Sequence, residues 1–126
     1  MARILVVEDD ALTGLALEIQ LRDLGAVVVA HHDAESATVQ LREQSFDAAV
    51  IDVGLPGMRG DELACECRRR CPDMAIVLAT GMSEHEVRTL FPLDGKVQIL
   101  EKPYEFQALR ECLRRLHVII CALCVR

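Results

Sequence analysis

The sequence predicts an α/β domain in which helices cover both faces of a doubly wound, five-stranded parallel sheet. Five short apolar runs alternate along the 126 residues with five segments whose apolar residues recur at helical spacing. The runs lack the polar–apolar alternation of half-exposed strands, which indicates strands buried on both faces. Because a helix follows every strand, crossover connections favour parallel pairing in three α/β/α layers.

The first half of the chain contains three apolar runs and two predicted helices. The runs are Arg3–Val7, Ala26–Ala30 and Asp47–Asp52. Helical spacing identifies the first helix through Leu12, Leu15, Ala16 and Ile19, and the second through Ala34, Ala37 and Leu41. Gly25 is suited to end the first helix, and the Asp33 carboxylate is suited to cap the second.

The second half repeats this pattern after a turn-rich loop at 54–60. The apolar runs are Ala75–Ala79 and Val97–Leu100. Helical spacing predicts three helices, through Leu63, Cys67 and Cys71, then Val87, Leu90 and Phe91, then Phe106, Leu109, Leu113 and Leu116. Pro72 ends the first of these helices, and Ser83 with Glu86 forms a capping box that begins the second.

Composition and charge argue against several classes of protein. The chain has 20 acidic and 14 basic residues, a net charge of −6, which argues against direct binding to nucleic acid. No apolar run approaches the roughly 18 residues of a membrane-spanning helix. The acidic segment Glu8–Asp10 follows the first apolar run too closely for a signal peptide. We therefore expect a soluble cytoplasmic domain with no membrane partner.

Six cysteines are many for such a chain, but their positions do not indicate a disulfide framework. Cys65, Cys67 and Cys71 fall within one predicted helix, where Cys65 and Cys67 point to different sides. Zinc ligands normally come from two short clusters on turns, so a zinc site is the less favoured alternative. We interpret these thiols as small apolar residues.

Polar and charged residues stand at the carboxyl ends of four predicted strands. Glu8, Asp9 and Asp10 follow the first strand, and Asp52, Thr80 and Lys102 stand at the ends of the third, fourth and fifth. In open parallel sheets, ligands bind beyond the carboxyl ends of the strands. If the first and third strands are neighbours, three or four carboxylates converge on one pocket, with a hydroxyl and an ammonium beside them.

Such a cluster of carboxylates favours a bound cation. Two carboxylates about 5 Å apart repel by about 3 kcal/mol at an effective dielectric constant near 20. Oxygen ligands suit Mg²⁺, with Mn²⁺ as an alternative, and the ion can bridge a carboxylate and a phosphoryl oxygen. A central carboxylate is then a candidate nucleophile. Taken alone, each of these residues also fits a helix cap, a turn or a surface charge. That interpretation would have to hold at four strand ends at once, so it is the less favoured one.

Four motifs resemble the receiver domain of two-component response regulators, over residues 3–117. They are Ile4-Leu5-Val6-Val7-Glu8-Asp9-Asp10, Val50-Ile51-Asp52 with Leu55-Pro56-Gly57-Met58-Arg59-Gly60, Ala79-Thr80-Gly81, and Leu100-Glu101-Lys102-Pro103. Each motif is weak alone, and their order and spacing make the resemblance specific. It implies a flavodoxin-like (βα)5 fold with strand order 2-1-3-4-5.

The resemblance also implies roles for the acidic residues. Asp52 would accept a phosphoryl group from a histidine kinase or a histidine phosphotransfer protein. Asp9 and Asp52 would bind Mg²⁺, Glu8 would act mostly through a metal-bound water, and the backbone carbonyl of Gly54 would complete the protein ligands. Asp10 falls one place past the acid pair, so we expect it to cap the first helix. No enzymatic activity is expected beyond phosphorylation and dephosphorylation of the chain itself.

A conformational response is implied as well. Thr80 would move toward the phosphoryl group, Lys102 would pair with it, and the Lys102–Pro103 peptide bond would be cis. Receivers often carry Phe or Tyr three residues before this lysine. Here that position is Ile99, so an aromatic switch cannot operate there.

The expected output is a protein-binding surface on the fourth helix, fifth strand and fifth helix, the usual contact face of receivers. We assign the receiver domain to residues 1–117 and an apolar extension to residues 118–126. The extension could pack against a second chain, together with the fifth helix, to form a homodimer. It could also fold back on the domain, or be an artefact. The chain could be a stand-alone receiver or one cut from a longer regulator or hybrid kinase.

Three other functions are weaker alternatives. A degenerate receiver would act only as a protein-interaction module, although Asp9, Asp52, Thr80 and Lys102 are all present. An FMN-binding domain of flavodoxin type is disfavoured because the acids after the first strand would repel the FMN phosphate. An Mg²⁺-dependent phosphatase of the aspartyl-nucleophile class usually has an acid two residues after the nucleophile, where this chain has Gly54.

Overall fold

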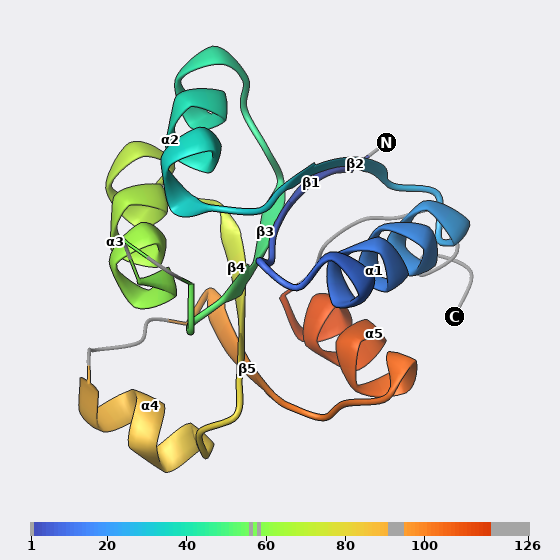
Figure 1. The fold of residues 1–126 in the computed structure, drawn as a ribbon, viewed down its shortest axis with the longest axis vertical. Coiled ribbons are helices and arrows are strands. Elements are labelled where there is room, and N and C mark those ends of the chain that lie inside the picture. The colour runs from blue at the N-terminus through green and yellow to red at the C-terminus, as the bar shows by residue number, and fades with distance from the viewer. Residues whose placement is uncertain (1, 56, 58, 91–94, 117–126) are drawn as a thin grey trace.

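The sheet has five parallel strands in the order β2-β1-β3-β4-β5, so β1 and β3 are neighbours (Figure 1). The computed structural model describes residues 2–55, 57, 59–90 and 95–116. The strands are β1 Arg3–Val7, β2 Val27–His31, β3 Ala48–Asp52, β4 Ala75–Thr80 and β5 Val97–Glu101. The helices are α1 Ala11–Asp23, α2 Ala34–Glu43, α3 Gly60–Arg70, α4 Glu84–Leu90 and α5 Phe106–Arg115. The predicted fold class and the implied strand order are confirmed.

Each strand end differs from its predicted position by no more than one residue. The central strands β1, β3 and β4 bury both faces as expected, whereas the edge strands β2 and β5 keep exposed and half-buried residues. In β1, Ile4 and Val6 face one apolar core, and Leu5 and Val7 face the other. α1 and α5 cover the first core, and α2, α3 and α4 cover the second (Figure 1). Successive side chains of a strand point to opposite faces, so a continuous apolar run supplies both cores.

α1 forms where helical spacing predicted it, but the face that it buries is not the face of the residues that predicted it. The residues whose spacing predicted the helix include Leu12, Leu15 and Ile19, which are 78%, 52% and 52% exposed. The buried residues of α1 are Gly14, Leu17 and Leu21. This helix has apolar residues at helical spacing on two faces, and packing against β1 and β2 decides which face is buried. The spacing therefore identified the helix and not its inner face.

The predicted signals at the helix ends are confirmed. The carboxylates of Asp10 and Asp33 each accept a hydrogen bond from the backbone N–H three residues on, at 3.2 and 2.7 Å. Gly25 follows α1 with a φ of 100°, a conformation that glycine adopts without a steric cost. The Ser83 hydroxyl accepts a hydrogen bond from the Glu86 N–H, and the Glu86 carboxylate accepts one from the Ser83 N–H.

The four described cysteines are free thiols, and their burial differs. Cys67 and Cys112 are buried, Cys71 is half-buried and Cys65 is exposed. Cys65 and Cys67 thus point to different sides of α3, as predicted. Phe91 and the extension 118–126 lie outside the described residues. Among the described helices, none is long and apolar enough to cross a membrane.

Candidate functional site

The acidic residues after β1 and at the end of β3 lie together. Val7 of β1 is opposite Ile51 of β3, so the next residues along the two strands are Glu8 and Asp52. One carboxylate oxygen from each of Glu8, Asp9 and Asp52 lies within 4.8 Å of the other two. Glu8 is 2% exposed and Asp52 is 8% exposed, whereas Asp9 faces solvent. The predicted convergence of carboxylates at this edge of the sheet is therefore present.

Lys102 brings a positive charge to the two buried carboxylates. Its Nζ lies 2.9 Å from Glu8 Oε1 and 3.3 Å from Asp52 Oδ1. The Lys102 N–H donates to the Thr80 carbonyl at 2.7 Å, and the Lys102–Pro103 bond is cis, as the resemblance implied. The ammonium was expected beside the carboxylates, and the structure shows that its shorter contact is with Glu8.

Burial and the neighbouring charges shift the pKa values of Glu8, Asp52 and Lys102. Burial, together with the hydrogen bond to Asp52, raises the pKa of Glu8 to about 7. Burial also opposes ionisation of Asp52, but hydrogen bonds from Glu8 and the Gly54 N–H, with the charge of Lys102, outweigh burial and lower the pKa of Asp52. Burial disfavours the charged form of Lys102, but its contacts with Glu8 and Asp52 outweigh that effect and raise its pKa. Glu8 is therefore a weaker acid, and Asp52 a stronger acid, than a carboxyl group in water.

A cavity of about 510 Å³ opens beside Asp52 and Lys102. Thr80, Met82 and Gly54 also line it. Thr80 is buried, and its Oγ1 accepts a hydrogen bond from the Met82 N–H at 3.0 Å. The Gly54 N–H donates to Asp52 Oδ1 at 3.0 Å. The Asp52 carboxylate is thus fixed by the backbone and by Lys102, with the cavity beside it.

Arg59 lines the same cavity, and sequence reasoning missed it. It lies just before α3 and forms an ion pair with Asp61 at 2.9 Å. Its position depends on the return of the loop past the end of β3, where the Gly60 N–H donates to the Val53 carbonyl at 3.0 Å. No local pattern distinguishes this arginine from a solvated one. A guanidinium beside an anion pocket is able to bind phosphoryl oxygens.

The two residues expected to take part in a conformational response lie on β5 and directly after it. Ile99 is half-buried and opposite Leu78 of β4. Ile99 and Pro103 line a groove of about 480 Å³ beside α4, β5 and α5. Four glutamates, Glu84, Glu101, Glu105 and Glu111, also line it, together with Arg115, which forms an ion pair with Glu111 at 3.3 Å. The implied output face therefore has an acidic groove, while the roles of Ile99 and Pro103 stay predictions.

The model of the response regulator receiver domain matches residues 4–114 of the chain. This chain belongs to the response regulator receiver family. The two-component response regulator PhoP of Pseudomonas aeruginosa is 36% identical to this receiver over 114 residues, which are 90% of this chain and 51% of PhoP. The chain spans about half the length of several curated relatives that it matches, and 24% of the response regulator protein FleR of Pseudomonas aeruginosa.

Solved receivers share the fold over nearly their whole length. The chemotaxis protein CheY4 of Vibrio cholerae superposes with a TM-score of 0.84 at 25% identity, covering 92% of this receiver and 98% of CheY4. The response regulator TrrA of Thermotoga maritima superposes with a TM-score of 0.79 at 26% identity, covering 92% of this receiver and 99% of TrrA. That TrrA structure is a complex with Mg²⁺ and BeF.

Proposed function

We propose that this receiver accepts a phosphoryl group on the Asp52 carboxylate from a phosphohistidine, with Mg²⁺ held by the adjoining carboxylates. One observation carries the proposal. The Asp52 carboxylate is buried at the end of β3, lies 3.3 Å from Lys102 Nζ and lines a cavity of about 510 Å³. Of the three clustered acids, Asp52 lines that cavity, whereas Glu8 and Asp9 do not.

The lowered pKa of Asp52 keeps its carboxylate ionised, the form that can attack phosphorus. In the transfer, one Asp52 oxygen forms a bond to phosphorus, and the bond from phosphorus to the imidazole nitrogen of the donor breaks. The electron pair of the broken bond returns to the imidazole. The product is an acyl phosphate, and attack by water on phosphorus restores the carboxylate and releases inorganic phosphate.

The residues present fit Mg²⁺, which prefers oxygen ligands. Asp9 and Asp52 would bind it directly, Glu8 mostly through water, and the Gly54 carbonyl would complete the protein ligands. The charge balance supports this assignment, because the single ammonium of Lys102 leaves the three clustered carboxylates with excess negative charge. When bound, the ion would neutralise negative charge between the carboxylates and the phosphoryl oxygens. Mn²⁺ has similar ligand preferences and would serve as well.

Three side chains in the cavity would bind the phosphoryl oxygens. Lys102 would pair with one oxygen, and the Thr80 hydroxyl would donate a hydrogen bond to another. Arg59 would bind the third through its guanidinium, which has several N–H donors. Their placement around Asp52 is the reason to prefer phosphoryl transfer to a role in protein binding alone.

The signal would leave through the surface of α4, β5 and α5. Thr80 ends β4 opposite Glu101 of β5, and α4 begins four residues later at Glu84. A shift of Thr80 would therefore act on both β5 and α4. With Ile99 on β5, the response would depend on the positions of Thr80 and α4 and not on rotation of a ring. Four glutamates against one arginine leave the groove with excess negative charge, which favours a downstream protein with a basic contact surface.

Intact mass after incubation with acetyl phosphate and Mg²⁺ tests the proposal. Wild type should gain one phosphoryl group, and Asp52→Asn should gain none. Asp73→Asn, an exposed acid in the turn before β4, is the matched control and should be phosphorylated like wild type. Phosphorylation of Asp52→Asn, or equal phosphorylation of wild type in excess EDTA, would show that the assigned acceptor or the metal requirement is wrong.

A further inference from the structure

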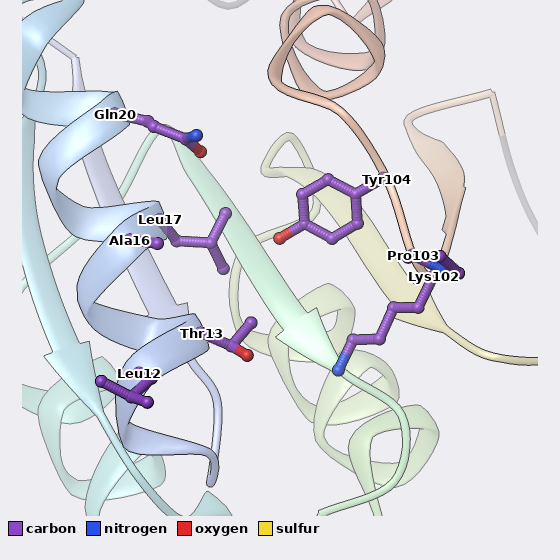
Figure 2. Close-up of a pocket in the computed structure, with 8 residues that line it drawn as sticks. All are labelled: Leu12, Thr13, Ala16, Leu17, Gln20, Lys102, Pro103 and Tyr104. Carbon is purple, nitrogen blue, oxygen red and sulfur yellow. The ribbon is translucent and has the colours of Figure 1, made fainter.

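A second groove, of about 560 Å³, lies between α1 and the turn from β5 to α5. α1 contributes Leu12, Ala16 and Leu17 to its walls, and the turn contributes Pro103 and Tyr104 (Figure 2). The Tyr104 hydroxyl points across the groove toward α1 (Figure 2). Lys102 lines both this groove and the cavity beside Asp52, but the groove has mostly apolar side chains, so it suits an apolar occupant.

The outer face of α1 continues this apolar surface into solvent. Leu12, Leu15 and Ile19 lie at helical spacing and are each more than half exposed. Only Val27 and Val39 join them as large apolar residues exposed within the described part of the chain. A contiguous apolar face of this kind usually marks a contact site.

The sequence after α5 has matching chemistry. Residues 118–125 are eight consecutive apolar residues, Val118, Ile119, Ile120, Cys121, Ala122, Leu123, Cys124 and Val125. Leu116, two residues before this segment, packs on the same core as Leu17 and Leu21 of α1. The ten residues of α5 span about 15 Å, and eight extended residues span about 26 Å. The segment is therefore long enough to return along α5 to Tyr104.

We propose that residues 118–125 fold back and dock in the groove between α1 and the β5–α5 turn, covering the apolar face of α1. Attachment to α5 makes this an intramolecular contact with an effective concentration on the order of millimolar. The same segment from a second copy would compete only at a comparable protein concentration. The segment of the same chain is therefore the favoured occupant of the groove.

Disulfide trapping in the full chain tests this contact, because Cys121 and Cys124 lie within the proposed segment. A disulfide requires Cα atoms within about 7 Å, so trapping reports close approach. In a Cys65→Ser background, Ala16→Cys places a thiol in the groove, and Val39→Cys places one at an exposed position of α2 as the matched control. Each variant is oxidised with diamide at micromolar concentration, quenched with iodoacetamide and mapped by peptide mass.

A disulfide within one chain from Ala16→Cys to Cys121 or Cys124, in at least tenfold higher yield than from Val39→Cys, is expected. Equal yields from the two positions would overturn the proposal, because they would place the segment outside the groove. A disulfide-linked dimer through the same cysteines would also overturn it, in favour of a second copy as occupant. Far-UV circular dichroism before oxidation verifies that both variants are folded.

A second measurement uses no cross-link. Ala16→Glu puts a charge into the groove and should increase the native alkylation rates of Cys121 and Cys124 at least threefold, whereas Val39→Glu should leave those rates unchanged. Unchanged rates in Ala16→Glu would contradict docking in this groove.

Discussion

Replacement of Gly60 by alanine should destabilise the domain, because α3 begins against the end of β3. A Cβ at position 60 would lie 2.1 Å from the carbonyl oxygen of Asp52 and 2.6 Å from the Cα of Val53. Both atoms belong to the backbone at the end of the strand that carries Asp52, so neither can rotate away as a side chain would. Gly60→Ala must therefore displace α3 or the end of β3.

The size of the effect follows from two opposing contributions. Overpacking costs about 1–3 kcal/mol, and a contact this short with backbone places Gly60→Ala near 3 kcal/mol. The higher helix propensity of alanine recovers at most about 1 kcal/mol. We expect a net loss of about 2 kcal/mol or more in the free energy of unfolding, roughly a 30-fold change in the folding equilibrium.

Gly14→Ala is the matched control, because it makes the same change in α1. A Cβ at position 14 would lie 3.7 Å from its nearest neighbours, Cβ and Cγ of Glu8, which is ordinary van der Waals contact. Gly14→Ala therefore keeps the gain in helix propensity and should raise the free energy of unfolding by up to about 1 kcal/mol.

Urea denaturation followed by far-UV circular dichroism measures both variants, with free energies obtained by linear extrapolation. The Gly60→Ala midpoint should fall below that of wild type, and the Gly14→Ala midpoint should stay level or rise. A Gly60→Ala midpoint equal to or above that of wild type would refute the close approach of α3 to the end of β3.

The remaining predictions concern the two faces of α1 and the thiols of α3. Leu21→Ala, at a fully buried position, should lower the free energy of unfolding by about 2–5 kcal/mol, and Leu12→Ala, on the exposed face, should change it by less than about 0.5 kcal/mol. Equal losses in urea denaturation would mean that the wrong face of α1 is assigned to the core. Burial raises the pKa of Cys67 to about 12, so this thiol stays protonated at pH 8.5, whereas Cys65 is exposed. Iodoacetamide should therefore alkylate Cys65 much faster than Cys67 in the native protein, by peptide mass mapping, and similar rates would contradict the burial of Cys67.

Sequence patterns located the elements of this receiver because those patterns arise from short-range physics. The caps at Asp10 and Asp33 each depend on a backbone N–H three residues away. Apolar runs such as that of β1 reflect the alternation of side chains along one strand. The convergence of Glu8 and Asp52 was predictable only on the condition that β1 and β3 are neighbours, and the strand order meets that condition.

The sequence by itself determined the alternation of strands and helices along the chain, the helix ends, and the presence of acids at the carboxyl ends of the strands. Only the tertiary structure decided which face of α1 is buried, since Leu12 and Leu17 both lie on apolar faces of that helix. It also decided that Lys102 pairs with Glu8 and that Arg59 lines the cavity beside Asp52. The reason is that burial and ion pairing depend on which segments meet across the sheet, and residues 94 positions apart carry no local signal of their contact.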